Sequence, residues 1–230
     1  MMRRVALGLG LAAVAVLLGG CDAFGPPPYH YKMTIEVQTP QGVKSFSSVR
    51  AISYRSRLEG AYIVKVKGEA VVIDLPGGPV FALLSGADGN GDYAGTIAEA
   101  ALVSKVKPGG ENRDYRQGQF AEIYPTVPSI ENYMPENPLP LLVRFRDITD
   151  PTSVERVEPA AIGPGVVLRR IAIAKTDEPV TTGIEGKLPY FGKSSGYLSW
   201  RQTLDNDDPR RRLTRSDFTA ADEFRERNTN

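Results

Sequence analysis

The chain has 230 residues, and its 28 basic and 27 acidic residues leave a formal net charge of +1. This balance gives no indication of nucleic acid or another acidic polymer as a partner. One cysteine and one histidine exclude an internal disulfide and any zinc site built from several His or Cys ligands. The length is sufficient for one large domain or two small ones with a core of ordinary size.

The N-terminal residues up to Cys21 have the three-part layout of a secretory signal peptide. A basic start, Met1–Arg4, precedes an apolar run, Val5–Leu18, and the small residues Gly19 and Gly20 lead to Cys21. The apolar run has about fourteen residues, whereas a membrane-spanning helix needs roughly 20. A retained membrane helix and an ordinary signal peptide with a nearby cysteine are the alternatives.

The sequence Leu18-Gly19-Gly20-Cys21 resembles the lipobox of bacterial lipoproteins, in which an aliphatic residue and two small residues precede an obligatory cysteine. The resemblance implies cleavage before Cys21 and attachment of lipid, including an acyl group such as palmitate, to that residue. Several acyl chains anchor a protein stably, whereas a single chain holds it only marginally. We therefore expect residues 1–20 to be removed and the mature protein to be attached to the membrane through Cys21 without spanning it.

The residues that follow Cys21 indicate how the domain is held at the membrane and which membrane it is attached to. Residues 21–28 are expected to form the lipidated start and a short tether, because Pro26, Pro27 and Pro28 favour the extended polyproline conformation. Asp22 resembles the inner-membrane retention signal of some Gram-negative lipoproteins, which favours the periplasmic face of the inner membrane over the outer membrane. His30 follows so soon after the anchor that a Ser-His-Asp site there is disfavoured.

Residues 29–202 are predicted to form one β-rich domain. Residues 31–38 alternate strictly between apolar and polar side chains, which is typical of a half-buried strand. Further strands are predicted at 43–54, 62–67, 70–75 and 80–84. Because only short turns separate these strands, they predict an antiparallel meander.

The segment after the fifth predicted strand has the spacing of a weak calcium-binding motif. Its oxygen-bearing residues at positions one, three, five and twelve of an EF-hand-like loop are Asp88, Asn90, Asp92 and Glu99. Tyr93 stands where such a loop needs glycine, so a solvated loop is favoured over a metal site. Thr96 and Glu99 also form a capping box, which predicts that a helix begins at Thr96. We expect no cofactor.

Residues 106–140 have no clear period, and prolines alternate with aromatic residues. A segment of this length without regular structure is uncommon inside a domain and is often functional. We predict that it contacts a protein partner in the envelope, and the candidate binding residues are Tyr115, Phe120, Tyr124, Tyr133 and Met134. In the alternative interpretation these aromatic side chains fill the core beneath a long loop, with a short strand at Phe120–Tyr124.

The second half of the domain has predicted strands at 141–146, 166–174, 180–188 and 196–202. Asp150 followed by Pro151 predicts the N-cap and first position of a short helix that ends at Pro159. The acidic run Asp147, Asp150, Glu155 and Glu158 is a candidate for paired-carboxylate hydrolysis, as are Asp88 and Asp92. A solvated acidic face is the simpler interpretation of this run.

Residues 203–230 are highly charged and contain few apolar side chains, so a largely disordered tail is predicted. In this tail, Thr219–Asp222 is expected to cap one or two helical turns. Two short segments, 143–159 and 180–184, resemble stretches of uncharacterised bacterial envelope proteins, and this resemblance implies no activity.

These observations predict a mainly β fold, an antiparallel β-sandwich or curved sheet with one or two short helices. The expected function is that of a membrane-anchored envelope lipoprotein with a non-enzymatic binding or interaction role and no nucleic acid partner. The alternative function is a carboxylate-dependent hydrolase tethered at the membrane surface.

Overall fold

The computed structural model describes residues 27–56, 62–102, 120–125, 137–190, 204–206 and 208–220. The predicted lipidation site Cys21, the candidate binding residues Tyr115, Tyr133 and Met134, and the strand predicted at 196–202 lie outside these residues. Within the described ranges, no helix is long and apolar enough to cross a membrane.

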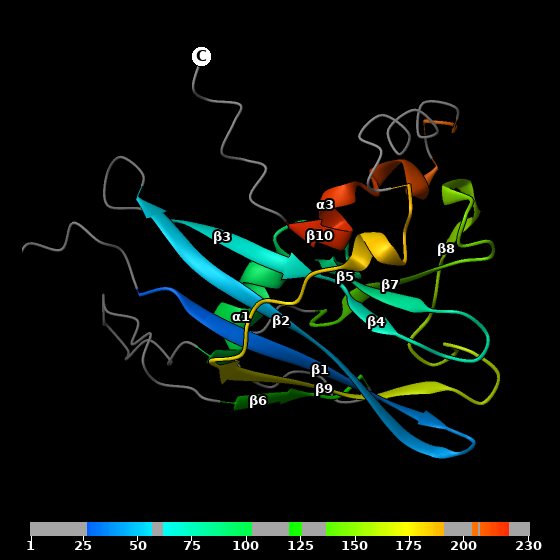
Figure 1. The fold of residues 1–230 in the computed structure, drawn as a ribbon, viewed down its shortest axis with the longest axis horizontal. Coiled ribbons are helices and arrows are strands. Elements are labelled where there is room, and N and C mark those ends of the chain that lie inside the picture. The colour runs from blue at the N-terminus through cyan, green and yellow to red at the C-terminus, as the bar shows by residue number, and fades with distance from the viewer. Residues whose placement is uncertain are drawn as a thin grey trace, which may run out of the picture.

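Strands in the described residues form two antiparallel sheets that pack face to face (Figure 1). Sheet 1 has the spatial order β10 (Thr219–Ala220), β3 (Tyr62–Glu69), β2 (Gly42–Ser56), β1 (Tyr29–Thr39), β9 (Val167–Thr176) and β6 (Phe120–Ile123). Sheet 2 has the order β4 (Val71–Ile73), β5 (Val80–Gly86), β7 (Pro140–Phe145) and β8 (Val154–Arg156). The predicted mainly β sandwich with short helices is confirmed.

β1 lies near the middle of sheet 1, between β2 and β9. Its alternating sequence explains this position, because successive side chains of a strand point to opposite faces. Tyr31, Met33, Ile35 and Val37 are fully buried, whereas the residues between them face away from the core. The buried side chains join residues of sheet 2, such as Val80, in core 1, the apolar cluster between the two sheets.

The chain passes from sheet 1 to sheet 2 between β3 and β4. β1, β2 and β3 are consecutive neighbours, as the predicted meander requires, but β4 pairs with β5 in the second sheet. At the junction the carbonyl oxygen of Glu69 accepts hydrogen bonds from Ser48 Oγ at 2.8 Å and Arg50 Nε at 3.1 Å. β5 is buried along its whole length and therefore needs packed layers on both faces. The prediction of one five-stranded meander is wrong, because the strands are divided between two sheets.

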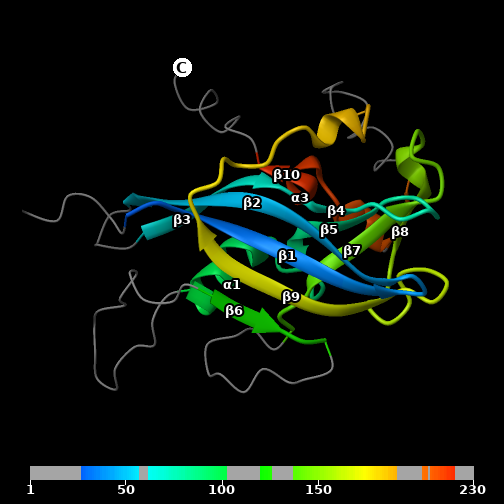
Figure 2. The same cartoon turned by 60° about the horizontal axis from the view of Figure 1, so that its bottom comes forward.

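Helix α1 (Tyr93–Leu102) packs in core 1 against β5, β9, β3 and β6 (Figure 2). It begins three residues before the predicted start at Thr96, because the amides of Gly95 and Thr96 already donate to the carbonyl of Asp92. Burial raises the pKa of Tyr31 and of Tyr93, so both hydroxyls stay protonated and donate hydrogen bonds. Tyr31 Oη donates to the carbonyl of Ala94 at 2.8 Å, which ties α1 to β1.

The other face of sheet 2 is covered by the C-terminal part of the described chain. We call the apolar cluster there core 2, and its centre is the aromatic triad Phe81, Phe145 and Phe218, whose ring centroids lie 5.8–5.9 Å apart. The covering elements are the 3-10 helices η3 (Ile184–Gly186) and η5 (Pro209–Arg212) and the short helix α3 (Arg215–Phe218). The prediction of a largely disordered tail is therefore wrong for residues 208–220.

Within that segment, a helical turn was predicted after a cap at Thr219, but the observed helix α3 lies before that residue. Thr214 forms the capping box with Asp217 at the start of α3, and Thr219 belongs to β10, which pairs with β3. The carbonyl of Phe218 accepts a hydrogen bond from Ala70 N at 2.8 Å. The C-terminal segment is thus joined to the point where the chain changes sheets.

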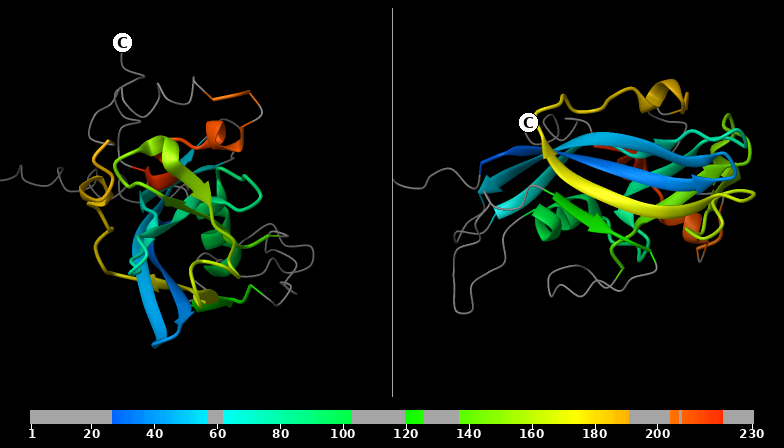
Figure 3. Two further views of the ribbon diagram at one scale, coloured as in Figure 1. Left: turned by 90° about the vertical axis from the view of Figure 1, so that its right-hand side faces the viewer. Right: turned by 90° about the horizontal axis from the view of Figure 1, so that it is seen from below.

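Two further predictions in the second half of the domain need correction. Asp150 does cap a helical turn through Thr152 N, at 2.8 Å, but the turn is the 3-10 helix η2 (Pro151–Ser153), and β8 follows it directly. Residues 180–183 hold no strand, and Ile184 begins η3 (Figure 3). The Glu69 carboxylate fixes this turn, because it accepts hydrogen bonds from Gly183 N at 2.9 Å and Ile184 N at 3.0 Å.

Candidate functional site

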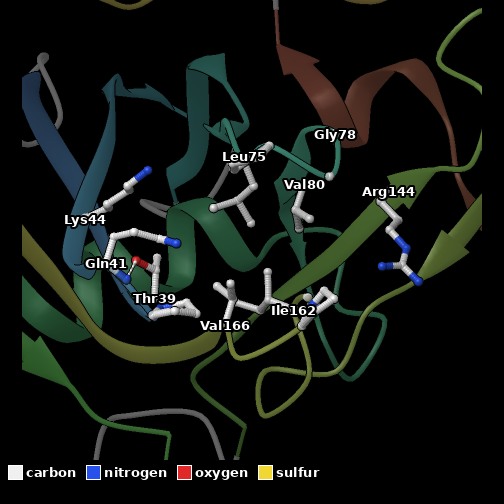
Figure 4. A pocket seen from close by; sticks show the side chains of 14 residues that line it. Thr39, Gln41, Lys44, Leu75, Gly78, Val80, Arg144, Ile162 and Val166 are labelled. Carbon is white, nitrogen blue, oxygen red and sulfur yellow. Dashed lines mark hydrogen bonds between the residues drawn. The ribbon is translucent and has the colours of Figure 1, made fainter.

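A pocket of about 400 Å³ opens where the turns of both sheets meet at one end of the sandwich (Figure 4). The first wall is the turn between β1 and β2, the second is the turn between β4 and β5, and the third is the loop before β9. Arg144 of β7 completes the lining. The lining residues are Thr39, Pro40, Gln41, Lys44, Leu75, Pro76, Gly77, Gly78, Val80, Arg144, Ile162, Gly163, Pro164 and Val166.

Local hydrogen bonds hold the turns that form the pocket. The Thr39 hydroxyl is buried, donates to the carbonyl of Gly42 at 2.8 Å and accepts from Gln41 N at 3.2 Å. Gly165, in the loop before β9, has a φ of +67°, and a Cβ there would lie 3.0 Å from Pro40 Cγ. A glycine is therefore needed where this loop contacts the first turn. Hydrogen bonds within the first turn and its close contact with the loop before β9 therefore fix the shape of these two walls.

The bottom of the pocket is apolar and its edges are polar. Val80 and Ile162 are each 1 % exposed and belong to core 1, and Leu75 and Val166 lie beside them. Figure 4 shows these apolar side chains between Lys44 and Gln41 on one side and Arg144 on the other. Such an apolar surface with a few polar groups at its edge is typical of small-molecule sites.

The charged residues that line the pocket, Lys44 and Arg144, are both basic. Arg144 Nε donates to Glu155 Oε1 at 2.6 Å, so a carboxylate outside the pocket already compensates part of that charge. Among the described residues, Lys44 has no hydrogen bond or ion pair. Within the described part of the chain, no acidic group therefore compensates the positive charge of Lys44 at the pocket.

The predicted contact residue Tyr124 lies elsewhere, beyond the end of edge strand β6, and the residue is 40 % exposed. Its hydroxyl donates to Glu122 Oε2 at 2.7 Å, and this bond raises the pKa of Tyr124. Glu122 and Glu36 both pair with Arg170, which lowers the pKa of Glu36. Tyr124 thus belongs to an ionic network across β6, β9 and β1, away from the pocket. Only the backbone of Phe120 is described, in β6.

Two of the four candidate ligands in the calcium-like loop, Asp88 and Asn90, use side-chain oxygens to bind the loop's own backbone. Asp88 Oδ1 accepts from Asn90 N and Asn90 Oδ1 accepts from Asp92 N, both at 2.9 Å, as in ordinary Asx turns. Glu99 lies within α1. The described residues hold no group of three His, Cys, Asp or Glu side chains placed to bind a metal ion.

The four carboxylates of the acidic run 147–158, which are candidates for hydrolysis, all have local partners. Asp147 and Asp150 accept from the backbone of Thr149 and Thr152, at 2.9 Å and 2.8 Å. Bonding to Thr149 lowers the pKa of Asp147, which is the opposite of what a general acid needs. Glu155 pairs with Arg144, and Glu158 with Arg156.

Sequence reasoning missed the pocket, since its first two walls were identified only as turns between strands and the loop of its third wall was not assigned. The turns are far apart in the chain, and nothing in any one of them indicates that they converge. The unusual local signal was the density of glycine and proline at residues 76–79 and 163–165. No protein-family model, curated protein or solved structure matches the chain.

Proposed function

We propose that the protein is an envelope lipoprotein, attached through lipidated Cys21 to the periplasmic face of the inner membrane, and that its folded domain is a non-enzymatic binding module. The signal peptide and lipobox support the anchor. The observation that carries the proposal of small-ligand binding is the pocket at the end of the sandwich, because turns of both sheets form its walls and its bottom is apolar. The partnered carboxylates give no support to the hydrolase alternative.

The position of the pocket fits such a module. The tether would enter at Tyr29, the start of β1, and the pocket lies at Thr39, where β1 ends. Eleven strand residues span roughly 35 Å, so the pocket would lie well away from the anchored end. Ligands would therefore reach it from the aqueous phase.

The anchor is tested by replacing Cys21 with serine in growing cells that contain a labelled fatty-acid analogue. The proposal requires that Cys21→Ser loses the label and accumulates as the unprocessed precursor, because only a thiol can form the thioether. Gly20→Ala is the matched control, since it keeps a small residue and should keep the label. Undiminished labelling of Cys21→Ser would refute the lipoprotein assignment.

The proposed attachment to the inner membrane is tested by density-gradient fractionation of the same cells. The protein should sediment with the inner membrane, and Asp22→Ser should move it to the outer membrane. Sedimentation of the unaltered protein with the outer membrane would refute this part of the proposal.

An envelope protein as a partner is supported by Tyr124, an exposed aromatic residue held by Glu122. A photo-crosslinking amino acid at residue 124 should give a discrete crosslinked product in intact cells. Residue 47, an exposed serine on β2, is the control position and should give none. Equal crosslinking at both positions would argue against a specific contact.

A further inference from the structure

We propose that the pocket binds a small amphiphile with one anionic head, a carboxylate or a phosphate, and an apolar chain. This inference rests on the proposed function in so far as it assigns a ligand to the binding module. Its basis is the combination of an apolar bottom with a lining whose charged residues are all basic.

The apolar part of the ligand would lie against Leu75, Val80, Ile162 and Val166. Val80 and Ile162 are buried core residues, so the bottom of the pocket is fixed before a ligand arrives. A volume of about 400 Å³ falls within the range of pockets that hold small molecules. Removing apolar surface of the ligand from water would supply most of the binding free energy.

The head group would pair with Lys44. Within the described residues this amine has no partner, and it lies at the edge of the pocket beside Gln41 (Figure 4). Arg144 lies on the opposite side of the apolar bottom and is paired with Glu155, so it adds positive charge to the pocket but does not hold the same head group. A charge-assisted hydrogen bond from the Lys44 amine to an anion is shorter and stronger than a neutral one.

Other classes of small ligand fit less well. A cationic amphiphile would meet two basic side chains and no acidic lining residue. A sugar would need several hydrogen-bonding groups, but the Thr39 hydroxyl is already occupied by Gly42 and Gln41. The charge and polarity of the lining therefore favour a single anionic group on an apolar body.

The test uses the full protein in phosphatidylcholine nanodiscs, titrated calorimetrically with octanoate and octyl phosphate. Nanodiscs that hold the Lys44→Gln/Arg144→Gln protein are the blank, which subtracts partition of the probe into lipid. At least one of the two anions should bind saturably, and comparison between them identifies the preferred head. Octanol and octylammonium, which have the same chain without the negative charge, should bind at least about tenfold more weakly.

Single variants locate the site. Lys44→Gln should weaken binding of the preferred anion by about tenfold or more, whereas Lys65→Gln, an exposed lysine on β3 outside the pocket, should leave it unchanged. Gly163→Leu should fill the pocket and also weaken binding, because a Cβ at residue 163 would contact only Val166, at an ordinary 3.8 Å. An unchanged melting temperature of Gly163→Leu in the absence of probe would show that the domain still folds.

The proposal is overturned if neither anion binds saturably, if octanol binds as tightly as octanoate, or if Lys44→Gln behaves like Lys65→Gln. These outcomes are independent of the anchor, which depends on labelling at Cys21. Undiminished labelling of Cys21→Ser together with saturable anion binding would refute the anchor and keep the ligand. Loss of the label in Cys21→Ser without anion binding by the unaltered protein would keep the anchor and refute the ligand.

Discussion

Arg50 and Gly68 lie so close together on neighbouring strands of sheet 1 that residue 68 has no room for a side chain. A Cβ there would be 2.9 Å from Arg50 Cγ and 3.1 Å from the carbonyl oxygen of Val49, and the φ of Gly68 is +136°. The glycine therefore makes room for the stem of the Arg50 side chain, whose Nε donates to the Glu69 carbonyl at the point where the chain leaves for sheet 2.

Replacing Gly68 with alanine should lower the free energy of unfolding by about 2–4 kcal/mol, from backbone strain and overpacking together. Urea denaturation of the purified protein measures the change. Gly77→Ala is the matched control, because nothing lies within 4 Å of a Cβ at that residue. It should change stability by less than about 0.5 kcal/mol. Equal effects of the two substitutions would contradict the close contact between residues 50 and 68.

Replacing Arg50 with methionine should leave stability unchanged or raise it. Arg50 is fully buried, and within the described residues its Nη2 has no hydrogen-bond partner. Its favourable contacts are hydrogen bonds to the Glu69 carbonyl at 3.1 Å and to Tyr31 Oη at 3.4 Å and a cation–π contact with the Tyr31 ring at 6.0 Å. Desolvation of a buried charge costs several kcal/mol and offsets such contacts, so an apolar side chain of similar volume is expected to be no worse. The carbonyl of Glu69 would keep its bond from Ser48.

Arg50→Ala provides the comparison for that experiment. It removes the charge and also leaves a cavity, so it should destabilise the protein by about 3 kcal/mol in the same urea measurement. A methionine variant that is destabilised as much as the alanine variant would show that the buried charge itself stabilises the fold.

Glu69 should make stability fall as the pH rises above about 4.5. Burial raises the pKa of this carboxyl above its usual value, and the bonds from Gly183 N and Ile184 N offset only part of that effect. The folded state therefore holds the proton more tightly than the unfolded state, and this contribution is lost as the pH rises through the folded pKa.

Glu69→Gln cannot ionise and is the reference for this prediction. Between pH 4.5 and 7, its stability relative to the unaltered protein should increase with pH in urea titrations. The lowered pKa values of Glu36 and Glu178 act below this window, because their contribution is lost as the pH falls through the folded pKa. A constant difference across the window would contradict the raised pKa of Glu69.

Replacing Phe218 with alanine should destabilise the protein by about 3–5 kcal/mol. The side chain is fully buried and packs on Phe81 and Phe145 in core 2. Val43→Ala, at a 44 % exposed apolar residue, is the control and should have an effect below about 0.5 kcal/mol. Thermal unfolding followed by circular dichroism measures both changes, and similar melting temperatures would mean that residues 215–218 do not belong to the folded core.

Local patterns predict the individual strands of this protein better than their connections. The strict alternation of β1 and the continuous apolar sequence of β5 indicate one half-buried and one fully buried strand, as the structure has them. Gly68-Glu69 looks like an ordinary hairpin turn, because the groups that redirect the chain, Ser48 and Arg50, lie about twenty residues earlier. A contact across that separation leaves no mark on the local sequence.

The C-terminal segment was mispredicted for a related reason. Its high charge is typical of a solvated chain, but the charges pair with one another and with the domain, as Asp208 does with Arg210 and Arg215 with Glu185. Two apolar side chains, Leu213 and Phe218, are then enough to join core 2. Composition alone cannot show whether charges compensate one another in space. The pocket could not be predicted from the sequence for a similar reason, because turns of both sheets form its walls and come together only in the folded protein.

The place of Phe218 in core 2 has a consequence for the order in which this protein can acquire its structure. Ribosomes deliver a chain from its N-terminus, so strands β1 to β9 emerge before the residues that cover the second face of sheet 2. Until residue 220 is free, Phe81 and Phe145 lack their third ring, and β3 lacks its neighbour β10. The nascent chain therefore exposes an aromatic surface on sheet 2 until residue 220 has left the ribosome, and such exposed apolar surface favours aggregation of incompletely folded chains.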